Sequence, residues 1–224
     1  MAEKSGEKAV KEADEIAKNL KKSNISDEVI EAAAKDSGKE GLEKLSKAAE
    51  KVGAENADKL AKEGYNLDNV IKLSDKGINP EKYAEYGIKN AKDAERAAKY
   101  LDRGKNLDEV KELMNGKVYM TGKDGEKELA NMFGGKSQVY MSTSMGGRYI
   151  DQFANGIAHE SKVGYTTLSE RIKKQILKNA ELIESKAING AHWHFFKSGV
   201  TGDGGASQPL LDFLIEHGIQ YTIH

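Results

Sequence analysis

The chain has 224 residues, enough for one large domain or two smaller ones, and its 35 basic residues nearly balance its 36 acidic ones. This balance excludes a uniformly basic nucleic-acid-binding protein, so any groove for nucleic acid must be local. The absence of cysteine excludes structural disulfides and thiolate metal sites. No stretch approaches the ~20 apolar residues of a membrane helix, and the first residues do not resemble a signal peptide. We therefore expect no stable membrane insertion, and any export to depend on a signal outside this chain.

The composition changes along the chain. All five histidines, all five phenylalanines and the single tryptophan lie after residue 130, whereas the residues before Met114 are mostly alanine, lysine, glutamate and aspartate. Such a shift predicts two domains, residues 1–115 and residues 116–224.

The first domain is predicted to be entirely helical. Residues 3–22 carry apolar side chains at helical spacing. Beyond them, glycines followed closely by an asparagine separate short amphipathic stretches, at Gly64, Gly77, Gly87 and Gly104. Glycine can end a helix in the left-handed conformation, and asparagine can cap the next one. "GYNLDNVIKL" and "GKNLDEVKEL" match at an offset of 40 residues, which indicates a degenerate helical repeat. This region is either a spacer or small bundle, or a delivery or docking module.

The second domain is predicted to be mixed. The expected elements, in chain order, are a helix at 125–133, strands at 137–143, 147–155 and 156–164, a helix at 168–186, a strand at 191–197, a helix at 207–218 and a strand at 219–224. Asn155-Gly156 is a favoured two-residue hairpin turn between the second and third strands. The predicted fold class is therefore α+β, with an all-helical N-terminal part followed by an α-β-β-β-α-β-α-β domain that has helices on both faces of a mixed sheet.

Three charged residues stand where a buried sheet is expected. Glu160 and Lys162 are two apart in one strand and so share a face, and the hairpin brings Asp151 to the open end of the same pair of strands. Carboxylate oxygens are natural ligands of Mg²⁺, and a metal would offset their mutual repulsion. The ammonium could orient a water or stabilise charge on a phosphate. A structural salt-bridge cluster at the edge of the sheet is the alternative.

This arrangement resembles the PD-(D/E)xK nuclease superfamily, which has the restriction-endonuclease-like fold. Its α-β-β-β-α-β core corresponds to residues 125–197, and Asp151, Glu160 and Lys162 fall on its motif, although Ile150 stands where the motif often has proline. The resemblance implies that Asp151 and Glu160 bind a divalent metal, Mg²⁺ first, with Mn²⁺ or Zn²⁺ as alternatives. It also implies a catalytic glutamate on the first helix, Glu126 with Glu128 as the alternative, and a catalytic glutamine on the next helix, Gln175.

Two stretches within residues 117–224 are "GGKSQVYMSTSMGGRYIDQFANGIAHESKVGYTTL" and "INGAHWHFFKSG". With them, this region also resembles the C-terminal toxin domains of bacterial polymorphic toxins, including contact-dependent inhibition toxins. That resemblance implies an endonuclease that cleaves DNA or tRNA, is carried on a larger secreted effector into the target-cell cytoplasm, and is neutralised by a cognate immunity protein. We expect this partner to be acidic, because it would oppose the basic residues of the cleft. Two other readings are a housekeeping repair or recombination nuclease, and a non-enzymatic helical scaffold with a degenerate nuclease fold.

Other charged residues are candidates for substrate binding. Arg148 precedes Asp151 at the mouth of the expected cleft and could meet a phosphate. Lys173 and Lys174, with Arg171 and Lys178, form either a phosphate-binding ridge or a solvated helix face.

The histidines offer no strong zinc spacing. His192 and His194 should share the strand face opposite Trp193 and Phe195, where they serve either near the carboxylates or as structural residues. His159 alternates away from Glu160, so it receives no catalytic role.

Overall fold

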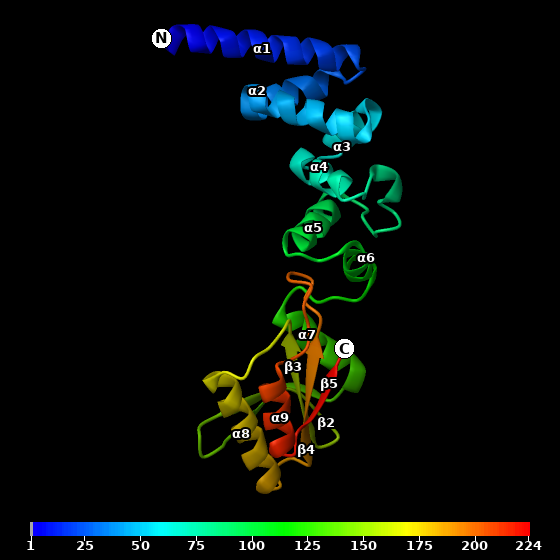
Figure 1. The fold of residues 1–224 in the computed structure, drawn as a ribbon. Helices are drawn as coiled ribbons and strands as arrows, with labels where there is room; N and C mark the ends of the chain where they lie inside the picture. Colours follow the sequence, from blue (N-terminus) through cyan, green and yellow to red (C-terminus); the bar gives the residue numbers. More distant parts are fainter. Residues whose placement is uncertain (1) are drawn as a thin grey trace. The chain divides into compact units, whose positions relative to one another are not determined.

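The computed structural model describes the backbone of residues 2–224 and the side chains from Lys8 onward (Figure 1). The chain divides into two compact units, one ending at Gly116 and the other beginning at Lys117. This division falls within one residue of the change in composition near residue 115.

The first unit is helical. Its elements are α1 (Ala2–Lys22), α2 (Asp27–Val52), α3 (Ala54–Lys62), α4 (Leu67–Asp75), the 3-10 turn η1 (Pro80–Lys82), α5 (Ala91–Asp102) and α6 (Leu107–Asn115). The four predicted helix-ending glycines all have positive φ, between 65° and 85°. Asn66, Asn90 and Asn106 then cap α4, α5 and α6 by accepting a hydrogen bond from a backbone N–H three residues ahead. The predicted glycine–asparagine punctuation is confirmed at these helices.

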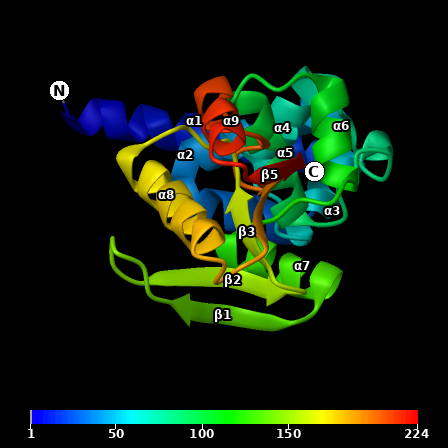
Figure 2. The same cartoon turned by 90° about the horizontal axis from the view of Figure 1, so that it is seen from below.

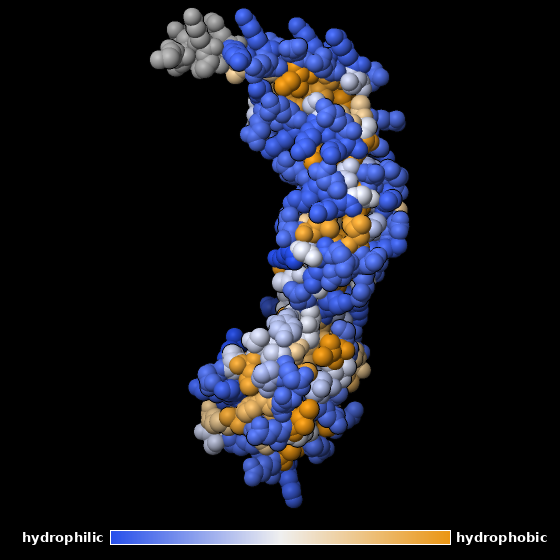
Figure 3. Space-filling view, in the orientation of Figure 1, coloured by the Kyte–Doolittle hydropathy of each residue, from blue (hydrophilic) through white to orange (hydrophobic). Residues whose placement is uncertain are grey.

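Short amphipathic helices of this kind are stable only when they pack on one another. Leu45, Leu73, Ile78 and Tyr100 are completely buried between the helices of the first unit. Hydrophilic side chains cover most of the visible face of this unit (Figure 3).

The second unit is α+β, as predicted. Its elements are α7 (Gly122–Phe133), β1 (Lys136–Met141), β2 (Arg148–Ala154), β3 (Ile157–Val163), α8 (Glu170–Glu184), β4 (Gly190–Phe196), α9 (Gln208–Glu216) and β5 (Gln220–Ile223). The predicted element order is confirmed. Helix α7 begins earlier than expected because Thr121 and Asp124 form a capping box, a local signal that the apolar periodicity does not contain.

The five strands form one mixed sheet in the order β1-β2-β3-β4-β5. The first three strands pair antiparallel, and β3, β4 and β5 pair parallel. Asn155 and Gly156 have φ of 51° and 79°, and a two-residue type I′ turn requires positive φ at both of these positions. The hairpin is therefore the predicted one.

The sheet lies between two layers of helices, and Figure 2 shows α8 and α7 on opposite sides of β3. On one face, Trp193 and Phe195 of β4 pack against apolar side chains of α8 and α9. On the other face, Phe196 packs with Leu129 of α7 and with Tyr119. Odd and even residues of the same strand thus belong to different cores, which fixes the face that each polar residue occupies.

Across residues 2–224, no helix combines the length and the apolar character needed to span a bilayer.

Candidate active site

Glu160 is the centre of a buried charge network on the face of the sheet that α8 covers. Only 3% of the residue is exposed. One carboxylate oxygen pairs with the Arg148 guanidinium and the other with the Lys162 ammonium. The Lys162 Nζ also lies 4.7 Å from the centre of the Trp193 ring, where the face of the indole attracts a cation. Glu160 and Lys162 therefore share one face, as their spacing predicts.

Arg148 is held on three sides. Besides its contact with Glu160, its Nε donates to Asn179 Oδ1 at 3.0 Å and its Nη1 donates to the Tyr149 carbonyl at 2.6 Å. The residue is 6% exposed. Arg148 was predicted at the mouth of a cleft, but its ion pair with Glu160 has no local sequence signal, because the two residues meet only across the hairpin. Contact with a substrate phosphate stays a prediction for this residue.

Asp151 stands where the β2–β3 ladder ends. Gln152, Phe153 and Ala154 pair with β3, and beyond them the Asp151 Oδ2 accepts a hydrogen bond from the Ser161 backbone N–H at 2.9 Å. Burial, followed by the negative charge of Glu160, raises the pKa of Asp151 to about 6. The side chain is thus an acid that the fold makes reluctant to ionise.

Glu126 of α7 also acts on Asp151, because its charge contributes to the raised pKa. The Glu126 Oε2 accepts from Gln138 Nε2 at 3.1 Å. Gln138 lies opposite Asp151 in the β1–β2 register, but the two residues do not pair. The backbone of Gln138 has a φ of 53°. Gly125 allows α7 to approach β3 this closely, since a Cβ at Gly125 would lie 2.8 Å from Val163 Cγ2. Gln138 was not among the predicted site residues, because its unusual backbone conformation has no local sequence signal.

The alternative helix carboxylate, Glu128, points elsewhere. It forms an ion pair with Lys117 at 2.5 Å. The two glutamates differ by about 200° around the helix, so only one of them can face Asp151. The geometry favours Glu126 over Glu128.

A pocket of about 530 Å³ opens beside the charge network, between the start of β2 and α8. Its lining carries four cationic residues and one acidic residue, together with a glycine, a tyrosine and a glutamine: Arg148, Arg171, Lys174, Lys178, Glu170, Gly147, Tyr149 and Gln175. The Gln175 Oε1 is buried without a hydrogen-bond partner among the described residues. A buried amide in this state has unused capacity for a ligand or a water.

Only some of the lysines predicted to form a ridge on α8 line this pocket. Lys174 lines the pocket, whereas the Lys173 ammonium forms an ion pair with Glu170 at 2.8 Å and is not part of the lining. Lys178 Nζ donates to the Gly147 carbonyl at 2.8 Å. Lys174 is therefore better placed than Lys173 to meet an anion in the pocket.

The donor set of Asp151 and Glu160 fits a hard divalent cation, and the raised pKa of Asp151 marks a place where added positive charge is favourable. No hydrogen bond from the described residues reaches the second carboxylate oxygen of Asp151. Glu160 is already engaged with Arg148 and Lys162. A metal at this site would therefore compete with Arg148 for one oxygen of Glu160.

The histidines of β3 and β4 lie on the opposite face of the sheet. His192 and His194 occupy the α7 face and Trp193 and Phe195 the other, which is the predicted alternation. His159 joins them, because its Nδ1 lies 3.1 Å from His194 Nε2. The approach of His159 to His192 was not predicted, because the parallel β3–β4 register that brings the two together is not encoded locally.

The structure therefore pairs Glu160 with both Lys162 and Arg148, and the charges of Glu160, Lys162 and Glu126 all act on Asp151. Among the described residues, the carboxylate oxygens of Asp151, Glu160 and Glu126 do not converge within 4.8 Å as a group of three. Arg148, Lys174 and Gln175 line one adjoining pocket, with Lys173 outside it. Comparisons of the chain with protein-family models, with curated proteins and with solved structures gave no match.

Proposed function

We propose that this chain is a metal-dependent nuclease whose second unit has the restriction-endonuclease-like fold, and that it acts as the toxin of a secreted bacterial competition system. The observation that carries the proposal is the buried Glu160 carboxylate, which is paired with Lys162 and whose negative charge raises the pKa of Asp151. The α-β-β-β-α-β order of α7 to β4 supports the fold assignment.

Asp151 and Glu160 would hold the metal, and the charge of Glu126 also acts on Asp151. When bound, a divalent ion lowers the pKa of a water and polarises a phosphate oxygen. Lys162 stabilises negative charge on the phosphate as the nucleophile approaches. Its ammonium is held in place by Glu160 on one side and by the Trp193 ring on the other.

The pocket beside Arg148 binds the nucleic-acid backbone. Its cationic lining attracts phosphates, and the excess of four cations over one carboxylate gives a local basic site on a chain with net charge of −1. Gln175 supplies an amide that can orient a phosphate oxygen or the attacking water. Substrate recognition and catalysis are then joined through Arg148, which lines the pocket and contacts Glu160.

The direct test is cleavage of plasmid DNA and of total tRNA by the full chain, with Mg²⁺, Mn²⁺ or Zn²⁺ and with a chelator. We expect one substrate class to be cut, the chelator to stop cleavage, and Asp151→Asn to remove activity while Asp212→Asn, an exposed carboxylate of the same unit, retains it. Absence of cleavage with every metal, or wild-type activity of Asp151→Asn, would contradict the proposal.

The toxin role has a separate test. A nuclease that enters neighbouring cells endangers its producer, so the producer needs an inhibitor that binds tightly and, opposite a basic pocket, is acidic. Expression of the chain in a susceptible bacterium should stop growth, and co-expression of the adjacent gene should restore it. Normal growth without that gene, from soluble and catalytically active protein, would favour a housekeeping nuclease instead.

A further inference from the structure

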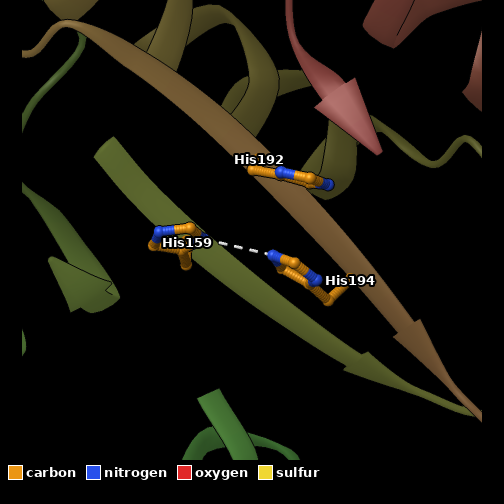
Figure 4. Close-up of side chains that lie close together, drawn as sticks. All are labelled: His159, His192 and His194. Carbon is orange, nitrogen blue, oxygen red and sulfur yellow. Dashed lines mark hydrogen bonds between the residues drawn. The ribbon is translucent and has the colours of Figure 1, made fainter. Parts of the chain in front are cut away.

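We propose that His159, His192 and His194 form a second metal site, selective for zinc or a similar imidazole-preferring ion, on the α7 face of the sheet. Figure 4 shows the three imidazoles gathered between β3 and β4. Each offers one ring nitrogen, and these nitrogens lie within 4.8 Å of one another. The proposal does not depend on the nuclease function.

The separations suit a common ion. Two nitrogens bound tetrahedrally at 2.0–2.1 Å from zinc lie about 3.3 Å apart. His159 Nδ1 and His194 Nε2 are 3.1 Å apart, so an ion can replace the hydrogen bond between them without moving the strands. His192 is paired with His159 in the parallel register, and its ring stacks 4.2 Å from the ring of His194. A modest rotation of His192 about its side-chain bonds completes three ligands.

Outer hydrogen bonds hold two of the rings in the orientation that binding requires. A metal-bound histidine normally donates its other ring N–H to a neighbouring acceptor. His194 Nδ1 lies 3.1 Å from His224 Nε2, and His192 Nε2 lies 2.8 Å from Thr222 Oγ1. With these nitrogens as donors, His194 Nε2 and His192 Nδ1 keep the free lone pairs that a metal needs.

The surroundings keep the imidazoles neutral. Burial lowers the pKa of His159 to about 4 and that of His194 to about 3, and it lowers the pKa of His192 as well. Neutral imidazole is the form that binds metal. The Phe133 ring stacks 3.9 Å from the ring of His159 and covers the cluster from α7, whereas His192 is only partly buried and leaves a route of entry.

The ion would have a structural effect. His159 belongs to β3 and the other two ligands belong to β4, while Thr222 and His224, which orient them, come from β5 and the residue after it. One ion thus ties the three parallel strands together. Because it binds the folded state, it raises the midpoint of thermal unfolding as its concentration rises.

The experiment is a titration of the chelator-treated full chain with Co²⁺, followed by visible absorption, together with thermal unfolding in the presence of Zn²⁺. We expect one equivalent of Co²⁺ with the intense visible bands of a tetrahedral site, and an increase in the midpoint with Zn²⁺. His159→Gln and His192→Gln should each weaken binding at least tenfold and remove the increase. His217→Gln, which changes a histidine outside the cluster, should behave as the wild type.

The variant Asp151→Asn distinguishes metal binding at the histidines from metal binding at the carboxylates. We expect it to retain the cobalt bands and the zinc-dependent increase. The proposal is overturned if the wild type binds no equivalent of Co²⁺ at micromolar concentration. It is also overturned if His159→Gln and His192→Gln retain the cobalt bands and the zinc-dependent increase, since the ion would then occupy another site, which is the carboxylate site if Asp151→Asn loses binding.

Discussion

The two units use charge in opposite ways. In the helical unit, many ion pairs lie in solvent, and an example is the pair of Lys99 and Glu95, whose side chains are 60% and 52% exposed. In the α+β unit, the side chains of Arg148 and Glu160 are 7% and 4% exposed. An exposed pair costs little and contributes little, whereas a buried pair must overcome the loss of hydration of both charges. Charged residues on a solvated helix face therefore cost the folded state little, whereas the buried charges of the sheet carry a large desolvation cost.

This difference indicates which charged residues to examine for function. A buried ion network is weak evidence of stabilisation, because apolar residues of similar volume often stabilise as well or better. The network here also adjoins a cationic pocket and an aspartate with a raised pKa. Perturbed ionisable groups in such a setting are typical of functional sites.

The largest expected effect is on activity. Lys162→Met should lower nuclease activity at least about a hundredfold, since removal of one transition-state donor commonly costs that much. Lys99→Met, the matched change in an exposed pair, should leave activity unchanged. Initial rates of substrate cleavage measure both. Equal rates for the two variants would remove Lys162 from the mechanism and weaken the contrast between the units.

The next effect is on stability. Glu160→Ala leaves Arg148 and Lys162 without their shared carboxylate, and loss of one partner of a buried pair costs about 3–5 kcal/mol. Glu95→Ala should show no measurable change, because its pair with Lys99 is solvated. Urea unfolding of both variants provides the comparison. If Glu160→Ala is as stable as the wild type, the network is more hydrated than its burial indicates.

Replacement of Asp151 should change stability in the opposite direction to replacement of Glu160. Its pKa is about 6 in the folded protein against 3.8 for an ordinary aspartate, so its ionised form opposes folding by about 3 kcal/mol at pH 7. The folded state binds the proton more tightly, so this cost is absent below pH 4, grows between pH 4 and 6, and is complete above pH 6. Asp151→Asn should therefore be more stable than the wild type at pH 7 and lose that advantage near pH 4.

Chelator must be present in this measurement, because a bound metal would offset the same repulsion. Asp212→Asn is the control, and its stability relative to the wild type should not follow the pH dependence of the Asp151 variant. A constant difference between Asp151→Asn and the wild type from pH 4 to 7 would show that Asp151 titrates as an ordinary aspartate.

The smallest expected effect concerns separation of the units. A chain of residues 117–224 should fold alone and cleave substrate within about twofold of the full-length rate, because its sheet and both cores lie within it. Circular dichroism and the cleavage assay test this. An unfolded or inactive product, beside an active full chain, would show that the helical unit completes the core or the site.

The sequence by itself determined the features whose causes are local. The glycine–asparagine boundaries of the helices follow from backbone preference and capping, and the Asn155-Gly156 turn follows from its two positive φ angles. Alternation along β3 and β4 then assigned Glu160 and Lys162 to one face and His192 and His194 to a common one. Each of these inferences needs only residues a few positions apart.

Tertiary structure alone decided which distant side chains meet. The pairing of Arg148 with Glu160, and the raised pKa of Asp151, depend on how the hairpin and α8 exclude water around them. The approach of His159 to His194 depends on the parallel β3–β4 register, which is set after the chain has crossed over through α8. A sequence gives the period of each strand, but register and burial arise only when separate elements pack, and these two quantities fix the charges and ligands of a site.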